Sequence, residues 1–503
     1  MPVRFDKLTC MIILEVVARY PETVGPSSET RMTDLAPPSR RDFLRQAGGG
    51  FGAVALSWLL RQEASVRADG PMNPLAAKPS HFPPKAKRVI YLFMHGGPSH
   101  LELFDPKPDL QRLAGQPLPE SFGPVATRRK VGQNPLLATK RTFARYGESG
   151  LEISDLLPKI ATRADDLAVI RSCWADSVNH PQAVYQMNTG SILMGKPSLG
   201  SWAGYGLGTE NQDLPAFVVL PDPAGGIKGG PPAYGSGFLP ASYQGTLVRS
   251  GKSPILDLKP QPEMSGDRQR KTLDLIGKLN HRHLESRGDD SELAARIQSY
   301  ELAYRMQSAA PDAVDFTRET EATKALYGLN DARTAEFGAR CLLARRLAER
   351  GVRFIQVYSG DVNGWDAHDD VEKNHAMMCA RTDGPVAALL TDLKRRGLFD
   401  DTLVIWGGEF GRMPMSEQGK GRDHNPHGFC VWMAGAGIKG GTVHGETDAV
   451  GLRAEVDRVH VHDLHATILH LMGIDHTQLT FPHNGRDERL TDTSGKVVES
   501  ILT

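Results

Sequence analysis

Cysteine is scarce in this sequence, with five residues in 503, and the five are widely spaced. They form no Cys-x-x-Cys pair and no Cys/His zinc pattern, so a disulfide framework is not expected. The sequence also lacks an excess of charge of either sign, because Lys+Arg and Asp+Glu each number 59. A balanced chain with a pI near 7.3 argues against a nucleic-acid partner and against a polybasic membrane-binding face.

Long apolar runs are missing as well. The apolar stretch near the N-terminus, residues 46–60, has about 15 residues, whereas a helix that spans a bilayer needs about 20. The pair Arg40-Arg41 precedes this stretch, and paired arginines before a weakly apolar segment are typical of a twin-arginine export signal. A retained membrane anchor is the alternative interpretation of the same residues.

We therefore expect residues 1–68 to be an N-terminal extension that ends in an export signal, cleaved after Ala68. Met32 could be the true start, because residues 1–31 are unusual upstream of such a signal. Removal of the signal would leave a protein with no stable membrane anchor. The twin-arginine route would deliver it to the periplasm or to another extracytoplasmic compartment.

No internal repeat is evident, and apolar residues make up 40% of the chain, enough for a sizeable core. We expect a linker over residues 69–87, followed by one large domain over residues 88–503. Within that domain, apolar and charged residues recur at helical spacing over residues 262–350, which predicts a helical insertion packed on a sheet. Residues 221–260, rich in Gly, Pro and Tyr, predict an ordered loop near the functional site.

Short apolar runs define the expected strands, which cover residues 88–94, 167–173, 216–220, 352–358, 402–406 and 429–433. Helices are expected over residues 151–161, 180–190, 332–350, from after His368 to Gly397, and 461–472. Strands that alternate with helices predict an α/β fold in which helices sandwich a mostly parallel central sheet. Ligands of such sheets bind beyond the carboxyl ends of the strands.

Carboxylates and imidazoles follow the expected strands, and we expect them on loops that converge there. The candidate metal ligands are Asp366, His368, Glu409, His424 and His427, with His95 after the first strand. Asp366 and His368 could instead be a turn-stabilising carboxylate and a surface histidine. Glu409 follows a buried strand and needs a cation partner, which could be a metal ion or the guanidinium of Arg412 or Arg422.

Arg412 and Arg422 bracket these residues, and guanidinium groups bind phosphate or sulfate in a bidentate manner. They could clamp an anion, or they could form salt bridges to Glu409 or Asp423. Asp423 and Asn425 could orient the ligands through hydrogen bonds. Ser99 is a candidate nucleophile, or alternatively a turn residue, and His180 with Thr189 could line the site.

Several motifs together resemble those of the domain-of-unknown-function 1501 family, common in planctomycete-type bacteria, over residues 87–503. The residues that carry the resemblance are Arg40-Arg41, His95-Gly96-Gly97-Pro98-Ser99-His100, Phe104-Asp105-Pro106-Lys107, Gly364-Trp365-Asp366-Ala367-His368, Gly408-Glu409-Phe410-Gly411-Arg412, Gly421-Arg422-Asp423-His424 and Asp463-Leu464-His465-Ala466-Thr467. That family looks like a branch of the alkaline phosphatase superfamily, which includes arylsulfatases.

The resemblance implies a one- or two-metal site that cleaves phosphate or sulfate esters. Asp366, His368 and His424 match metal-ligand positions of the superfamily, and Glu409 keeps a carboxylate where the following histidine is replaced by Phe410. His95 stands where the first metal-binding acid usually stands. The Cys-x-Pro-x-Arg motif of formylglycine sulfatases is absent.

Three functions are consistent with this pattern. The first is an exported, metal-dependent hydrolase of phosphate or sulfate esters, acting on an anionic small molecule or polysaccharide ester without formylglycine. The second is a non-catalytic binding or scaffold protein with a degenerate alkaline phosphatase-like site, and the third is a structural surface protein. Zinc fits the histidine and carboxylate ligands best, and manganese or calcium also fit.

Overall fold

Strand β1 (Arg88–Met94) is the centre of the main sheet. It is seven residues long, and every residue from Val89 onward is buried, as expected for a strand covered on both faces. It pairs in parallel with β7 (Phe354–Ser359) on one side and β8 (Thr402–Gly407) on the other. All three strands were predicted from their apolar runs, and the structure confirms them.

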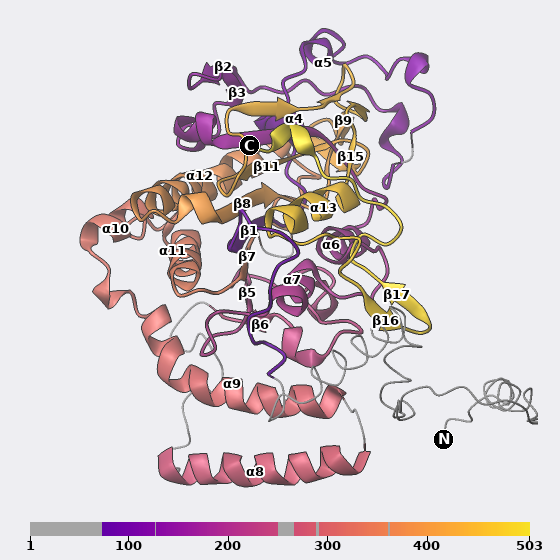
Figure 1. Ribbon diagram of the computed structural model, residues 1–503. Helices are drawn as coiled ribbons and strands as arrows, with labels where there is room; N and C mark the ends of the chain where they lie inside the picture. The colour runs from indigo at the N-terminus through magenta and orange to yellow at the C-terminus, as the bar shows by residue number, and fades with distance from the viewer. Residues whose placement is uncertain (1–72, 126, 250–265, 288–290, 361–362) are drawn as a thin grey trace, which may run out of the picture. The chain divides into compact units, whose positions relative to one another are not determined.

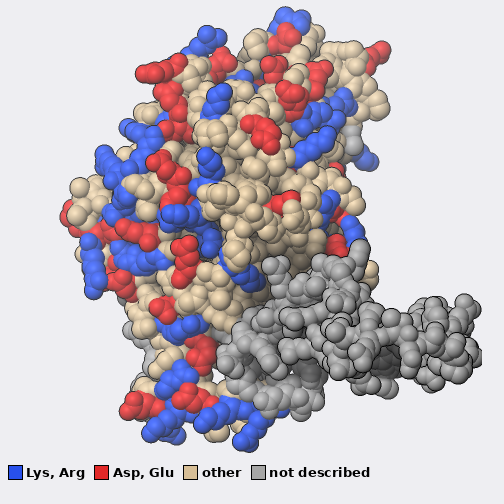
Figure 2. All heavy atoms as spheres, in the orientation of Figure 1, with Lys and Arg blue, Asp and Glu red and all other residues tan. Residues whose placement is uncertain are grey.

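The computed structural model describes residues 73–503 apart from 126, 250–265, 288–290 and 361–362 (Figure 1). The predicted export signal lies outside the described residues. Among the residues that are described, no helix is both long and apolar enough to span a bilayer. Figure 2 shows basic and acidic side chains interspersed over the visible face of this part of the chain.

The main sheet has the strand order β12-β4-β11-β8-β1-β7-β5-β6, with β15 also paired to β4. The strands not yet defined are β4 (Leu167–Trp174), β5 (Phe217–Leu220), β6 (Thr246–Leu247), β11 (Phe429–Ala434), β12 (Thr442–His444) and β15 (Val459–His460). Within this sheet β11 runs antiparallel to both its neighbours, β4 and β8, and the other pairings are parallel. The predicted mostly parallel sheet is confirmed, with β11 as the exception.

The direction of β11 has a consequence for the site. Because β4 and β8 are each antiparallel to β11, they point the same way as one another. The carboxyl ends of β1, β4, β5, β7 and β8 therefore meet at one edge of the sheet. Loops that leave five strands at a common edge can bring residues from distant parts of the sequence together.

Helices cover both faces of the sheet (Figure 1). Side chains of β1 alternate between two cores, as the pleat of a strand requires. Ile90, Leu92 and Met94 lie in the core with α11 (Ala335–Glu349) and α12 (Val371–Arg395). The intervening residues lie in the core with α6 (His180–Thr189), α7 (Leu199–Leu207) and α13 (Val461–Leu471). The predicted helix–sheet–helix sandwich is confirmed.

Two local predictions are wrong. Residues 151–161 were expected to be a helix, but β3 (Leu151–Ser154) pairs antiparallel with β2 (Phe143–Tyr146), and a 3-10 helix, η3 (Ile160–Asp166), follows. Residues 411–425 were expected to be loops, but β9 (Gly411–Glu417) and β10 (Gly421–Asn425) form a buried antiparallel hairpin. His424 therefore lies on a strand, where its side-chain position is better defined than on a loop.

The segment expected to be a helical insertion contains the helices α8 (Gly266–Arg287), α9 (Ser291–Val314), α10 (Glu321–Leu326) and α11, with turns between α10 and α11. Residues 73–87, expected to be a linker, are bonded to the main unit. The backbone N–H groups of Lys85 and Ala86 donate to the carbonyl of Leu471, and Leu75 is buried.

Candidate metal centre

The loops at the common sheet edge supply the candidate site. His95 follows β1, His180 begins α6 after β4, Lys228 lies in the loop after β5, Asp366 and His368 follow β7, and Glu409 follows β8. The hairpin adds Arg412 from β9 and His424 from β10. This is the position at which open α/β sheets bind their ligands.

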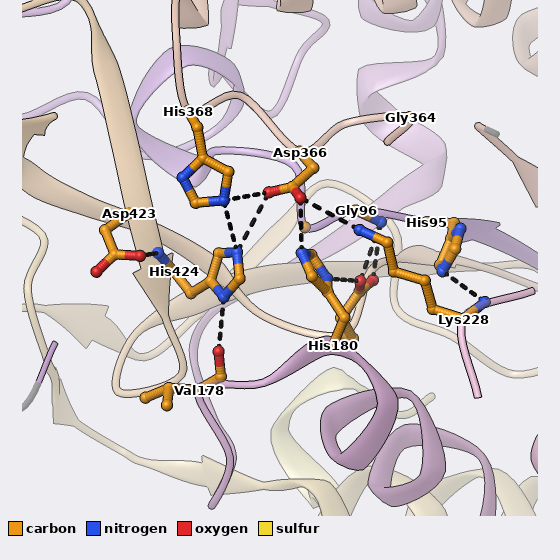
Figure 3. A network of polar contacts seen from close by, with 12 residues as sticks. His95, Gly96, Val178, His180, Lys228, Gly364, Asp366, His368, Asp423 and His424 are labelled. Carbon is orange, nitrogen blue, oxygen red and sulfur yellow. Dashed lines mark hydrogen bonds and ion pairs between the residues drawn. The ribbon is translucent and has the colours of Figure 1, made fainter. Parts of the chain in front are cut away.

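Three candidate ligand atoms, Asp366 Oδ1, His368 Nε2 and His424 Nε2, form a small triangle (Figure 3). Asp366 Oδ1 lies 2.9 Å from His368 Nε2 and 3.2 Å from His424 Nε2. The two Nε2 atoms are themselves 3.0 Å apart. The other carboxylate oxygen, Oδ2, lies 3.0 Å from His180 Nε2 and 3.2 Å from Lys228 Nζ.

The second ring nitrogen of each histidine identifies its tautomer. All three Nδ1 atoms lie 2.6 Å from an acceptor oxygen, which is Glu409 Oε1 for His180, Glu417 Oε2 for His368 and the carbonyl of Val178 for His424. A carbonyl or ionised carboxylate only accepts, so we assign the ring proton to Nδ1. In a neutral imidazole, Nε2 then carries a lone pair, and all three lone pairs face Asp366.

Contacts of this length between Nε2 atoms and a carboxylate are favourable when a cation, either a metal ion or a ring proton, lies between the atoms. Burial lowers the pKa of His424 to about 3, and the positive charge of Arg412 adds to this effect, although Asp366 opposes it. His424 is therefore neutral at physiological pH and cannot itself supply the positive charge. His180 Nε2 is buried and makes no hydrogen bond among the described atoms.

The dimensions of the triangle fit a metal ion. The ligand atoms of a tetrahedral ion with bonds of about 2.0 Å lie about 3.3 Å apart, close to the three separations in the triangle. His180, Asp366, His368 and His424 together form a group whose ligand atoms all lie within 4.8 Å of one another. Each ligating histidine also has a hydrogen-bonded acceptor on its other nitrogen, as is usual for metal-bound imidazole.

Asp366 is held ionised by its surroundings. Burial raises the pKa of the Asp366 carboxyl, but contacts with the three imidazoles and with Arg412 outweigh burial and hold the pKa well below its usual range. The carboxylate is thus available as an anionic ligand at neutral pH.

Arg412 positions the Asp366 carboxylate and is not an open anion clamp. The side chain is fully buried. Its guanidinium donates to Asp366 Oδ1 at 2.7 Å and to the carbonyl oxygens of Gly96, Gly97 and Arg422. The sequence left open whether Arg412 clamps an anion or forms a salt bridge, and in the structure it forms a salt bridge to Asp366.

Arg422 lies outside the candidate centre. It is fully buried, and its guanidinium donates to Glu102 Oε1 at 2.7 and 3.1 Å and to backbone carbonyls of the hairpin. Burial raises the pKa of Glu102, but Arg422 outweighs burial and the pKa falls below its usual value. Arg422 and Glu102 therefore form a buried structural ion pair. The sequence had suggested Glu409 or Asp423 as the salt-bridge partner of Arg422, and the structure gives Glu102 instead.

Loss of Arg422 is expected to destabilise the fold without removing the metal centre. Arg422→Met should lower the free energy of unfolding by about 3–5 kcal/mol, because Glu102 is left as an unpaired buried charge. Chemical denaturation measures this change. The double variant Arg422→Met/Glu102→Met is the control and should recover most of the loss, whereas equal stability of the single variant and the wild type would contradict a structural role.

Glu409 interacts with the candidate centre indirectly, through a hydrogen bond with His180. Its fully buried carboxylate accepts a hydrogen bond from the Gly96 N–H at 3.0 Å and one from His180 Nδ1 at 2.6 Å. Burial raises the pKa of Glu409, but the hydrogen bond from His180 outweighs burial and lowers the pKa to about 2. Gly96 has a φ of +114°, and a Cβ there would lie 2.6 Å from the backbone nitrogens of Trp365 and Asp366.

Three other residues predicted from the sequence, His95, His427 and Ser99, are not part of the close group around Asp366. His95 Nε2 accepts from the Lys228 N–H at 3.2 Å. The backbone of His427 bonds to the Asn425 side chain and to Ala454. Ser99 is fully buried, and its N–H donates to His375 Nε2, so the structure does not present it to the centre as a nucleophile.

The family model for DUF1501, described as a protein of unknown function, matches residues 86–502. The chain belongs to the DUF1501 family. The family predicted from the sequence motifs is thereby confirmed. No curated protein matches this DUF1501 chain.

Solved structures similar to this DUF1501 protein include alkaline phosphatase- and sulfatase-like enzymes. The phosphonate monoester hydrolase of Silicibacter pomeroyi is 13% identical, with 69% of this chain and 71% of that chain covered and a TM-score of 0.33. The alkaline phosphatase of the Antarctic bacterium TAB5 is 12% identical, with 70% and 92% covered and a TM-score of 0.29. The PsFucS1 sulfatase of Pseudoalteromonas sp. is 11% identical, with 77% and 68% covered and a TM-score of 0.30. Values this low transfer no reaction and no residue role.

Part of the candidate site of this DUF1501 chain, namely His180, Lys228 and Glu417, was not predicted from the sequence as central to it. His180 was considered only as a lining residue beside Thr189, yet Thr189 lies at the opposite end of α6. His180 is the first residue of a helix that follows a strand. This position lies at the ligand-binding edge of the sheet, and it could have identified His180 from the sequence. Lys228 and Glu417 carried no local pattern that distinguishes them from surface charges.

Glu417 and Asp423 form a second close group with His368. Arg129 already contacts both of these carboxylates. The Arg129 side chain lies 3.0 Å from Glu417 Oε1, and its N–H donates to Asp423 Oδ2 at 2.7 Å. Asp423 also accepts from the His424 N–H at 2.9 Å. We therefore assign both carboxylates of this DUF1501 protein to the orientation of His368 and His424, a role that the sequence had suggested for Asp423.

Glu417→Gln is expected to weaken metal binding by about 10- to 100-fold, because the acceptor that orients His368 loses its charge. Competition with a metal-sensitive dye measures the affinity. Arg129→Gln is the matched control, since it removes only the outer, half-exposed partner of Glu417, and should change the affinity much less. Equal affinities in the wild type and Glu417→Gln would contradict the assigned orientation of His368.

Proposed function

We propose that this protein is a metal-dependent hydrolase of phosphate or sulfate esters that acts without formylglycine. The observation that carries the proposal is the convergence of three imidazole Nε2 atoms on the ionised, mostly buried carboxylate of Asp366. An exported protein of this kind is consistent with the arginine pair Arg40-Arg41 at the N-terminus. The motif that formylglycine formation requires is absent from the sequence.

Asp366, His368 and His424 would hold the ion, and zinc fits this ligand set best. When bound, such an ion polarises the ester oxygens and lowers the pKa of a water molecule. Three protein ligands leave a fourth position for that water, as catalytic zinc sites do. Arg412 keeps the Asp366 carboxylate oriented toward the two imidazoles.

His180 is suited to accept a proton from the attacking water. Its Nδ1–H is held by Glu409 at 2.6 Å, so its Nε2 lone pair points at the centre. This carboxylate–imidazole pair is the arrangement by which enzymes fix a general base in the correct tautomer. Because Glu409 is also bonded to the Gly96 N–H, the base is anchored to the end of the central strand.

Lys228 is suited to bind the anionic group of the ester. Arg412 and Arg422 are fully buried, whereas the Lys228 side chain is 15% exposed and its ammonium lies 3.2 Å from Asp366 Oδ2. A positive charge next to a scissile phosphate or sulfate stabilises the charge that develops in the transition state. Ser99 is buried elsewhere, so water is the nucleophile in this proposal.

A second candidate function is supported by the burial of the centre. His180, Glu409, Arg412 and His424 are each at most 3% exposed, and the side chains of Asp366, His368 and Lys228 are exposed by 10–15%. A sealed ion would stabilise a binding or scaffold protein instead of reaching a substrate.

Metal analysis combined with turnover separates the two functions. The purified protein would be assayed for bound zinc, manganese and calcium, and then for hydrolysis of 4-nitrophenyl phosphate and 4-nitrophenyl sulfate. Bound metal with turnover of either ester supports the hydrolase. Bound metal without turnover favours the binding protein, and absence of any bound or bindable divalent ion contradicts both.

A further inference from the structure

A mostly apolar pocket of about 450 Å³ lies at the end of strands β5 and β6. Its lining consists of Pro221, Asp222, Pro223, Gly225, Gly226, Ile227, Gly230, Pro231, Tyr234, Leu247 and Arg249. The volume falls in the range of about 300–1,000 Å³ that is typical of small-molecule sites. Arg249 is the one cation in this lining.

The pocket and the metal centre share one loop. Ile227 lines the pocket, and the next residue, Lys228, turns the other way. The Lys228 N–H donates to His95 Nε2 at 3.2 Å, and its ammonium lies 3.2 Å from Asp366 Oδ2 (Figure 3). A single residue of backbone therefore separates the pocket wall from the candidate centre.

The shared loop is anchored at both ends, so the pocket is preformed. The buried carboxylate of Asp222 accepts from the Gly360 N–H at 3.0 Å and from the Arg340 guanidinium at 3.1 Å. Burial raises the pKa of Asp222, but Arg340 outweighs burial and the pKa falls below its usual value. Further along, the hydroxyl of Tyr185 donates to the Gly229 carbonyl at 2.8 Å.

We propose that this pocket binds an aromatic or compact apolar organic group of the ester whose anionic end is held at the metal centre. The inference rests on the proposed hydrolase function and names its substrate class. Lys228, at the junction, would contact the anionic group while Ile227, Tyr234 and Leu247 contact the organic group. Desolvation of an apolar group against such a lining is favourable in proportion to the area buried.

The lining also argues against a sugar ring in this position. A saccharide needs several hydrogen-bonding partners around its hydroxyl groups, because a buried polar group without a partner is costly. Most of the lining is apolar, and Oδ2 of Asp222 is already bonded to Gly360 and Arg340, so Arg249 and Tyr234 supply most of the remaining polar side-chain atoms. A small aryl or alkyl ester therefore fits better than a polysaccharide ester.

The test compares benzyl phosphate with methyl phosphate, whose leaving alcohols are matched in acidity, on the full chain in its metal-loaded form. The wild type should prefer the benzyl ester by at least about tenfold in kcat/KM, mainly through KM, as expected for a hydrophobic group in a pocket. Leu247→Asp places a charge in the pocket away from the centre and should remove most of this preference, with turnover of methyl phosphate and metal content unchanged. Leu193→Asp, at an exposed apolar position outside the pocket, is the matched control.

Equal kcat/KM values for the two esters in the wild type, or an unchanged preference in Leu247→Asp, would overturn the pocket assignment while the hydrolase proposal stands. A chain that hydrolyses neither ester overturns the hydrolase proposal, and calorimetric binding of phenylphosphonate then decides the pocket by itself. At least tenfold weaker binding in Leu247→Asp than in Leu193→Asp supports the pocket. Equal binding by both variants, or none by the wild type, overturns it.

Discussion

Asp366→Ala is expected to abolish stoichiometric metal binding and to lower kcat/KM for ester hydrolysis by about 10³-fold or more. The carboxylate is the shared anion of the centre, since both His368 and His424 lie within 3.2 Å of its Oδ1 atom. Loss of the ion removes several kcal/mol of transition-state stabilisation, and each 1.36 kcal/mol corresponds to a factor of ten. Elemental analysis of the purified variant and steady-state kinetics measure the two effects.

Asp369→Ala is the matched control for this variant. Asp369 belongs to the same loop and carries the same charge, but its side chain is exposed and outside the candidate ligand group. We expect wild-type metal content and turnover from it. A full complement of tightly bound metal in Asp366→Ala would show that the ion, if any, is held elsewhere.

His180→Ala is expected to lower kcat by about 10²- to 10⁴-fold while the metal stays bound, because a general base contributes about this much. Glu409→Gln should have a smaller effect in the same direction, since it weakens the orientation of His180 but leaves the ring in place. Kinetics at saturating substrate and elemental analysis of the same samples separate base catalysis from ligation.

His427→Ala is the control for the removal of an imidazole near the site. The sequence suggested His427 as a ligand, but it lies outside the group that surrounds Asp366. It should retain both metal and turnover. Loss of metal in His180→Ala would instead make His180 a fourth ligand, and the centre would then be a closed structural site.

The architecture was largely predictable from the sequence because buried strands are continuous apolar runs. β1, β7 and β8 follow that rule over almost their whole length. The direction of β11 was not predictable, because an apolar run reads the same in parallel and antiparallel pairs. Residues 151–161 were misassigned because a short apolar stretch fits a helix and a strand equally well.

The hairpin of β9 and β10 escaped prediction for a different reason. Its residues are buried, but most are polar or charged, and Met413 and Met415 on β9 are too short an apolar pattern to predict a strand. Arg412 and Arg422 are buried because carboxylates and backbone carbonyls from distant segments satisfy them. Such partners are set by the tertiary fold and leave no local trace in the sequence.

The residues that we propose as ligands were recognisable in the sequence where chemistry and position agreed. Asp366 and His368 are two residues apart after a buried strand, and His424 lies in a motif rich in ionisable groups. Glu409 was expected to be a ligand because a buried carboxylate needs a cation partner, and the structure supplies His180 and the Gly96 N–H instead. His180 comes from another part of the chain and needed the strand order to be placed.

Anomalous diffraction from crystals grown with zinc, recorded on both sides of the zinc absorption edge, shows whether a metal ion occupies the candidate centre. We expect one strong peak within about 2.0–2.2 Å of His368 Nε2, His424 Nε2 and a carboxylate oxygen of Asp366. A zinc-saturated crystal with no peak between these three residues, and with Lys228 still paired to Asp366, would contradict this expectation.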